Sequence, residues 1–237
     1  MLSTASPSSH SWFLQVRDLC KKYGLPDPLS ILHNPPSKDS FKKNARLKVQ
    51  DWWQNKYRTE AAPLKSLKYF DANYMSLSNP HPIWTSARHS QYEVKKAIVQ
   101  ARMLSGRYRT CWLRRHWSGD SAGVCRIPGC TNQPGTLLHL ATAECPGLAA
   151  ARVKAVAIWS VFLRENPHLF PIISFYSLGE SENFVKFLLD PTTRPPVIAL
   201  SQSHSDGQSE IIAKLCYLTR TWLFIMHKER LMLLNLW

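Results

Sequence analysis

Apolar residues recur at helical spacing in five stretches of the chain, and proline-rich joints separate several of these stretches. The predicted helices span residues 11–23, 37–62, 88–106, 148–164 and 209 onward. Each helix has one face of apolar residues that is expected to be buried. In the same order, these faces are Phe13, Val16 and Cys20; Phe41, Ala45, Val49 and Trp52 or Trp53; Val94, Ile98, Ala101 and Leu104; Ala149, Val153, Val156, Trp159 and Leu163; and Ile211, Leu215, Leu218, Trp222 and Ile225. The pattern therefore predicts a mainly α-helical protein.

Breaks in this pattern suggest three segments. An N-terminal helical region is expected over residues 1–86, with an extended connector at 73–84 because prolines disfavour helix there. A basic helix followed by a cysteine-containing loop occupies 87–165. A C-terminal helical region, 166–237, contains two short apolar segments at 165–189 and a Pro/Ser-rich exposed connection at 190–208.

Composition narrows the class of partner. The 237 residues are 44% hydrophobic, which is enough for one large domain or two small ones. Thirty Lys and Arg against sixteen Asp and Glu give a net charge of +14, so a polyanion is the expected partner. No run approaches the roughly 18 apolar residues of a spanning helix, and the start lacks the apolar core of a signal peptide. We expect an intracellular protein, in the nucleus or cytoplasm, with no membrane partner.

Three cysteines and a histidine lie close together in a turn-rich stretch. Cys125, Cys130, His139 and Cys145 have the spacing C-x4-C-x8-H-x5-C. Thiolates and an imidazole at short spacing are the ligands of tetrahedral Zn²⁺. With four protein ligands the shell is closed and leaves no position for an activated water, so the predicted Zn²⁺ is structural and no catalytic residue is assigned.

The alternative is that these are ordinary core residues, because cysteine is often buried and His139 lies among leucines. Residues that form turns favour the zinc site over the interpretation as core residues. Gly123 and Gly129 permit tight turns, and the prolines at positions 128 and 146 stiffen the first loop and end the chain segment at the last ligand.

The segment before this loop is basic and aromatic. Residues 88–116 contain eight Lys and Arg side chains and one acid, Glu93. Arginines neutralise phosphates and aromatic rings stack on unpaired bases, which favours RNA or DNA as the partner over a merely solvated helix face. The predicted contacts are Arg102, Arg107, Tyr108, Arg109, Trp112, Arg114 and Arg115, with the two aromatic residues as stacking candidates.

A hydrolase is not favoured. Residues 119–123 match G-x-S-x-G, but a nucleophile elbow should follow an apolar strand, and this string follows Arg114-Arg115-His116. We read it as a polar turn that leads into the cysteine loop. No small-molecule substrate is expected.

The chain as a whole resembles the region after the polymerase in proteins of non-LTR (LINE-like) retrotransposons. The resemblance is carried in order by SWFLQVRDLC (11–20), SLKYF (66–70), MSL (75–77), PHPIW (80–84), MLSGRYRT (103–110), RHWS (115–118), the Cys/His loop, FLLDP (187–191), LTRTW (218–222) and HKER (227–230). It implies that the four loop residues form a CCHC zinc knuckle that helps to hold template RNA or target DNA. The loop spacing is slightly looser than is usual in that family.

Polymerase chemistry needs paired aspartates that hold two Mg²⁺ ions, and the chain contains no adjacent Asp-Asp. We therefore expect a nucleic-acid-binding fragment that is not an enzyme by itself and that could also contact the polymerase part of the same element. The alternative from a different class is a protein-interaction module. In that case Trp-rich helices dock onto another protein, and zinc only holds the loop in shape.

Overall fold

The structure is a computed structural model that describes residues 11–71, 80–87, 90–110, 123–131, 133–142, 144–171, 181–193 and 208–235. These residues form α-helices and short 3-10 helices, and no β-strand occurs among them apart from an isolated bridge between Val124 and Pro134. The predicted mainly helical fold is confirmed.

The chain divides into two units. The smaller, N-terminal unit contains residues 1–63 and 75–79, and the larger, C-terminal unit contains residues 64–74 and 80–237. This division differs from the predicted boundaries at residues 86 and 165. Helices on both sides of residue 165 share one hydrophobic core, so the basic helix, the cysteine loop and the last helix belong to the same unit.

The N-terminal unit is built from α1 (Trp12–Tyr23), α2 (Pro28–His33) and α3 (Lys38–Ala61). The first and third match the predicted helices, and α2 was not predicted. Gly24 ends α1 with φ of 65°, a left-handed conformation that glycine adopts without strain. The Ser37 hydroxyl caps α3 by accepting a hydrogen bond from the Ser40 N–H. Among the described residues of this unit, only Cys20 is fully buried.

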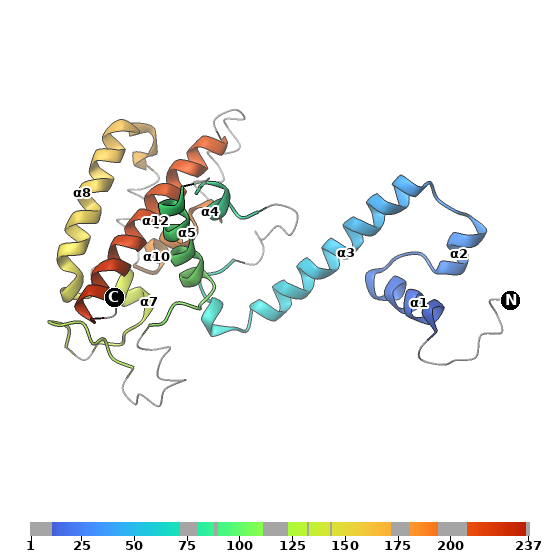
Figure 1. The fold of residues 1–237 in the computed structure, drawn as a ribbon, viewed down its shortest axis with the longest axis horizontal. Helices are drawn as coiled ribbons and strands as arrows, with labels where there is room; N and C mark the ends of the chain where they lie inside the picture. Colours follow the sequence, from blue (N-terminus) through green and yellow to red (C-terminus); the bar gives the residue numbers. More distant parts are fainter. Residues whose placement is uncertain are drawn as a thin grey trace. The chain divides into compact units, whose positions relative to one another are not determined.

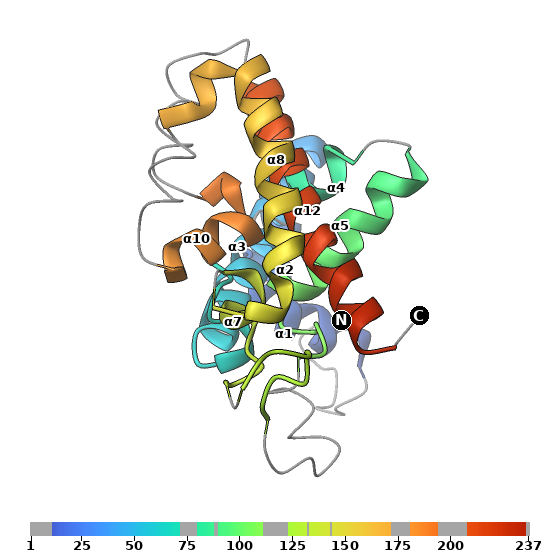
Figure 2. The same ribbon diagram turned by 90° about the vertical axis from the view of Figure 1, so that its left-hand side faces the viewer.

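The C-terminal unit is arranged around its last helix, α12 (Gln208–Leu233). Its neighbours in space include α4 (Pro82–Thr85), α5 (Gln91–Leu104), α8 (Ala149–Glu165) and α10 (Ser181–Leu189). Figures 1 and 2 show α12 between α5 and α8, with α7 (Leu137–Ala141) near its C-terminal half. The remaining elements are the 3-10 helices η2 (Lys65–Leu67), η4 (Pro146–Leu148), η5 (Pro167–Leu169) and η6 (Pro191–Thr193).

Two tryptophans join α8 to α12. The ring centroids of Trp159 and Trp222 lie 4.7 Å apart, and both residues are buried. The Trp159 indole N–H donates to the carbonyl oxygen of Leu218 at 3.2 Å, so its polar group is satisfied inside the core. Leu215 and Leu218 are fully buried on the same side of α12, as its predicted face required.

A buried ionic network joins α5 to α12. The Glu93 carboxylate accepts from Arg220 Nε at 2.6 Å and from Lys96 Nζ at 2.7 Å. The Arg220 guanidinium also donates to the hydroxyl and carbonyl oxygens of Ser86, and Lys96 donates to the Thr221 hydroxyl. Burial alone raises the pKa of Glu93, but the hydrogen bonds from Lys96 and Arg220 outweigh it and leave the pKa below its ordinary value.

This network corrects the predicted face of α5. Among Val94, Ile98, Ala101 and Leu104, only Leu104 is fully buried, and Lys96 is 5% exposed although it was counted as a basic surface residue. Lys96 can be buried because an ion pair and a hydroxyl satisfy its ammonium group.

The predicted face of α8 is only partly correct, since Trp159 is the one predicted residue that is fully buried. Val153 is 72% exposed and Val156 is 50% exposed, whereas Ala151, Ala155 and Trp159 are buried. Apolar residues occur all around this helix, so their spacing alone could not select its buried face. The two alanines allow the α8 and α12 backbones to approach closely.

Two further segments differ from prediction. The connector expected at 73–84 contains α4, which His81 caps by accepting a hydrogen bond from the Ile83 N–H at Nδ1. The other imidazole nitrogen lies 3.2 Å from the buried Asp190 carboxylate, which ties α4 to the end of α10. That helix, α10, was not predicted within the apolar segments at 165–189.

Within the part of the chain that the structure describes, one stretch, Leu137–Glu165, passes a length-and-composition test for a membrane span, with a mean hydropathy of 1.4. It includes Glu144, Arg152 and Lys154, so it is not the unbroken apolar run whose absence was expected. The stretch contains α7, η4 and α8 rather than one regular helix, and two of the four predicted metal ligands lie in it. A single stretch of this kind is weak support for a membrane protein.

The ionic network gives a first testable prediction. Glu93→Gln leaves the buried Arg220 and Lys96 without an anionic partner, so we expect the free energy of unfolding at pH 7 to fall by about 2–3 kcal/mol. The folded pKa of Glu93 lies below its ordinary value of 4.5, so its stabilisation is full above that pH and is lost as the pH falls through the folded pKa. Urea unfolding from pH 7 to 3 should therefore show a weaker pH dependence in the variant.

Glu210→Gln is the matched control. Glu210 also pairs with a lysine, Lys214, on the same helix that carries Arg220, but its side chain is 71% exposed. We expect little change in stability for this variant. Equal losses for the two variants would show that burial of the Glu93 network is not what stabilises the unit.

Candidate metal centre

The first two ligand candidates lie on a loop that closes on itself. The Cys125 N–H donates to the Gln133 carbonyl at 2.7 Å, and the Gly135 N–H donates to the Gly123 carbonyl at 2.9 Å. Within the loop, the Cys130 N–H donates to the Ile127 carbonyl at 3.1 Å. Gly123 and Gly129 have φ values of 58° and 82°, so the tight turns expected at both positions are present.

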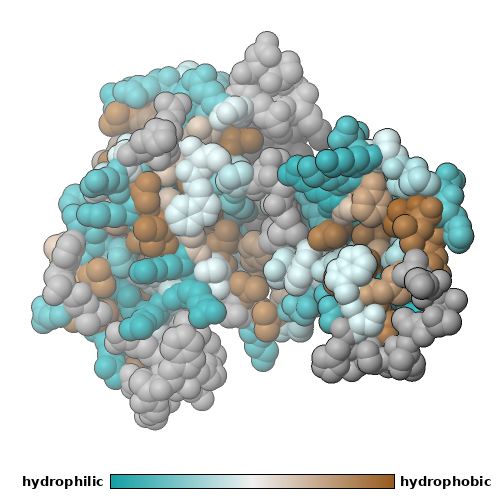
Figure 3. Space-filling view, turned by 45° about the vertical axis from the view of Figure 1, so that its right-hand side comes forward, coloured by the Kyte–Doolittle hydropathy of each residue, from teal (hydrophilic) through white to brown (hydrophobic). Residues whose placement is uncertain are grey.

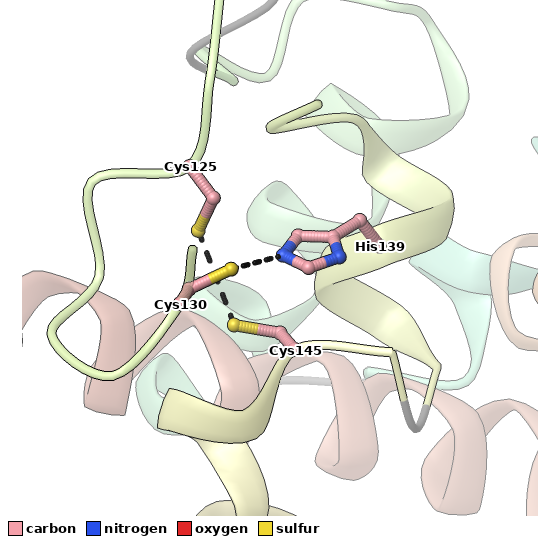
Figure 4. A group of neighbouring side chains, drawn as sticks. All are labelled: Cys125, Cys130, His139 and Cys145. Carbon is pink, nitrogen blue, oxygen red and sulfur yellow. Dashed lines mark hydrogen bonds between the residues drawn. The ribbon is translucent and has the colours of Figure 1, made fainter. Parts of the chain in front are cut away.

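The other two ligand candidates lie on helical elements that follow the loop. His139 is in α7, where its backbone N–H donates to the Thr136 hydroxyl that caps the helix. Cys145 directly precedes η4 and lies at its N-cap. The chain turns between these two elements, which points both side chains toward the loop (Figure 4).

The four ligand atoms converge. All lie within 4.8 Å of one another, with the Cys125 and Cys145 sulfurs 3.9 Å apart and the Cys130 sulfur 3.2 Å from His139 Nε2. A tetrahedral Zn²⁺ with Zn–S bonds of about 2.3 Å separates two sulfurs by about 3.8 Å. An ion therefore fits after the widest separation shortens by about 1 Å at most, and the group could hold a metal such as zinc.

Burial and backbone hydrogen bonds act in opposite directions on the thiols. Burial raises the pKa of Cys125 to about 12 and also raises that of Cys145, while it lowers the pKa of His139. Backbone N–H groups counter this effect: that of Ile127 donates to the Cys125 sulfur, and those of Gly147 and Leu148 donate to the Cys145 sulfur. Donors aimed at sulfur stabilise a thiolate, and a neutral imidazole is the form that binds metal. Without a metal the raised pKa values favour protonated thiols, so binding of a cation would have to release their protons.

An arginine of α8 supports the last ligand. Arg152 Nη1 donates to the carbonyl oxygens of Cys145 at 2.7 Å and of Thr142 at 3.1 Å. Three thiolates, one imidazole and one Zn²⁺ together carry a charge of −1, which the guanidinium offsets. Sequence analysis missed this residue. Its position one or two helical turns after the last ligand could have suggested it.

Gly147 is needed for close packing of the loop against η4. A Cβ added there would lie 2.3 Å from Ile127 Cγ2 and 2.5 Å from the Pro128 carbonyl oxygen. Real Cβ atoms do not approach other atoms this closely, so any side chain at position 147 would push the first loop away from Cys145.

The helical core of the same unit contacts the candidate metal centre through α7. The Trp222 indole N–H of α12 donates to the carbonyl oxygen of Ala141, the last residue of α7, at 3.2 Å. The same ring packs on Trp159 of α8. Two helices of the core thus fix the position of His139 and the start of α8.

The predicted nucleic-acid contacts have mixed outcomes. The side chains of Arg102, Arg107 and Arg109 are exposed, as phosphate contacts require. Trp112, Arg114 and Arg115 lie outside the described residues.

The predicted stacking role of Tyr108 is wrong. This residue is 8% exposed, and its hydroxyl lies 3.0 Å from His227 Nδ1. Its ring has the Arg230 guanidinium 5.3 Å from its centroid and contacts the His227 ring, so a base cannot reach it. The turn directly after α5, where Gly106 has a φ of 66°, directs the side chain back toward α12.

The chain matches no protein-family model, no curated protein and no solved structure. The metal centre therefore rests on the geometry of its own residues.

The geometry predicts loss of metal when one ligand is removed. Cys130→Ser replaces a thiolate by a much weaker ligand, so zinc content measured by native mass spectrometry should fall from one ion per chain to none. Cys20→Ala is the control, because Cys20 lies in the other structural unit and should leave the zinc content unchanged. Equal zinc content in wild type and Cys130→Ser would contradict the assignment.

Gly147→Ala tests the packing of the loop without touching a ligand. The added methyl group must displace Ile127 and Pro128, so we expect a lower zinc affinity in chelator competition, by tenfold or more, and a lower Tm. Ala150→Ser, at an exposed position of α8, is the matched control and should change neither value appreciably. An unchanged zinc affinity in Gly147→Ala would show that loop and η4 need not approach this closely.

Proposed function

We propose that the chain binds RNA or DNA through its basic surface and a structural zinc knuckle, and has no polymerase activity of its own. The convergence of Cys125, Cys130, His139 and Cys145 is the observation that carries the proposal. A four-ligand site is closed, so its metal would hold the loop in shape rather than activate water. The net charge of +14 supplies the attraction for a polyanion.

Exposed arginines that precede the knuckle in the sequence support a phosphate-binding role. Arg102 is in the last turn of α5, and Arg107 and Arg109 follow it. These side chains lie in the same structural unit as the metal centre. In this proposal they neutralise phosphates and the knuckle presents its loop to the same strand.

The resemblance to non-LTR retrotransposon proteins remains part of the proposal. In that view the chain is a binding fragment of a reverse-transcriptase protein, works inside the cell in the nucleus or cytoplasm, and could contact the polymerase part of its own element. The ordered set of sequence strings supports this origin.

One observation favours the protein-interaction alternative. Val153, Val156 and Val161 are between 49% and 72% exposed and lie along one side of α8. Such a surface could dock another protein, and salt separates the two functions because an apolar interface would respond little to it.

The test is a titration of labelled single-stranded RNA and DNA at several salt concentrations. Binding through phosphates should weaken with a slope of about −0.7 in log K per log salt for each phosphate neutralised on a single strand. Arg107→Gln with Arg109→Gln should reduce the slope by about 1.4 and weaken binding.

Lys154→Gln with Arg164→Gln removes the same charge from exposed positions of α8 and serves as the control. This variant should retain the wild-type slope. Absence of binding at low salt, or a slope that neither variant alters, would contradict the proposed function.

A further inference from the structure

Three aromatic side chains of α3 and one of α1 form a cluster in the N-terminal unit, which we call the aromatic cluster: Tyr23, Trp52, Trp53 and Tyr57. The rings of Tyr23 and Trp52 meet edge to face at 5.4 Å, and those of Trp52 and Trp53 at 5.0 Å. Trp53 and Tyr57 are stacked, with centroids 5.6 Å apart and planes at 27°. This cluster is not a sealed core, since each of its four side chains is half-buried or exposed.

Two lysines lie over these rings. The Lys22 ammonium is 4.5 Å from the Trp52 centroid and 5.6 Å from that of Trp53, and the Lys56 ammonium is 5.1 Å from Trp53. Cation–π attraction holds both ammonium groups at the cluster. Lys22 is exposed, so its ammonium group is accessible to an anion. The Lys56 side chain is 39% exposed, and its ammonium group lies 3.7 Å from the Glu60 carboxylate, so Lys22 is the more available of the two cations.

The end of the stack is open. Tyr57 is 42% exposed although one of its faces lies on Trp53. A flat ligand could therefore continue the stack on Tyr57. Aromatic side chains that present a free face in this way are the platforms on which unpaired bases stack.

Cations continue along the same side of the helix. At 100° per residue, Lys42 and Arg46 fall on the stripe of α3 that contains Trp53 and Tyr57. Both are exposed, and within the described residues neither is paired with an acidic side chain. The stripe is about 22 Å long, from 15 residues at a rise of 1.5 Å. In Figure 3 the surface of this unit shows teal hydrophilic areas next to pale and brown ones.

We propose that the aromatic cluster and the stripe of Lys42 and Arg46 form a second binding site for single-stranded nucleic acid. One base would stack on Tyr57, and phosphates along the strand would meet Lys42 and Arg46, with Lys22 and Lys56 beside the rings. An acidic peptide would satisfy the cations but leave the open aromatic face unused, so a ligand with both phosphates and flat bases fits better. The inference rests on the proposed function for its class of ligand, but it uses none of the same residues.

The test compares two labelled probes of equal length, a dT oligomer and the corresponding abasic oligomer, on the full-length chain. The probes have the same phosphates, but only the first has bases. Tyr57→Ala should raise the Kd for the dT oligomer about fivefold or more and leave the Kd for the abasic oligomer unchanged. Tyr57→Phe keeps the ring and should bind as wild type does.

Charge removal should act differently. Lys42→Gln with Arg46→Gln should weaken binding of both probes and lower the salt slope by about 1.4.

Tyr57→Leu, which retains an apolar side chain on the helix, guards against loss of fold and should repeat the result of Tyr57→Ala. Circular dichroism confirms the helix content of each variant.

The outcomes separate the two hypotheses. If Tyr57→Ala changes neither probe, or weakens both equally, the second site is overturned whatever Arg107→Gln and Arg109→Gln do. If the α3 variants weaken binding as described but the Arg107 and Arg109 variants do not, the second site stands and the proposed role of the knuckle region fails. Absence of dT binding by the wild-type chain overturns the second site, and absence of RNA binding as well overturns the proposed function.

Discussion

The convergence of three thiols and one imidazole within a few ångströms constrains the centre of this protein. The segment from residue 123 to 148 has little regular structure, and its described part is organised by one β-bridge, a short helix and turns. A metal ion bound to Cys125, Cys130, His139 and Cys145 would join the loop, α7 and η4 at a single point. Trp222 connects α7 to the core, so a metal bound there would be linked to the packing of α12.

The site is suited to structure rather than to reaction. Its ligands come from a single segment, three of them are buried, and backbone N–H groups donate to the sulfurs of Cys125 and Cys145. Burial excludes water from the site and disfavours ionised thiols, whereas the backbone N–H groups favour the thiolate. Arg152 adds the charge that offsets the excess negative charge of three thiolates on one divalent ion. The four ligands therefore suit a closed site, in which a metal would hold the loop in shape and leave no position for a reacting water.

Sequence patterns predicted the ligands and most helix positions for identifiable reasons. The short Cys/His spacing and the glycines at 123 and 129 predict a local loop. Such a loop can be predicted because its ligands and turn residues lie close together in the sequence. Gly24 and Ser37 likewise marked the end of α1 and the start of α3. What failed depended on contacts distant in the sequence. Lys96 is buried because Thr221 lies beside it and Arg220 shares its partner Glu93, and Tyr108 is buried because His227 and Arg230 lie opposite.

The most direct test of the metal centre is X-ray absorption spectroscopy at the zinc edge on the purified, reduced full-length chain. The proposed site predicts one zinc per chain, with three sulfur ligands at about 2.3 Å and one nitrogen ligand at about 2.0–2.1 Å. A shell dominated by oxygen and nitrogen, or a protein without zinc after purification with zinc supplied, would contradict it.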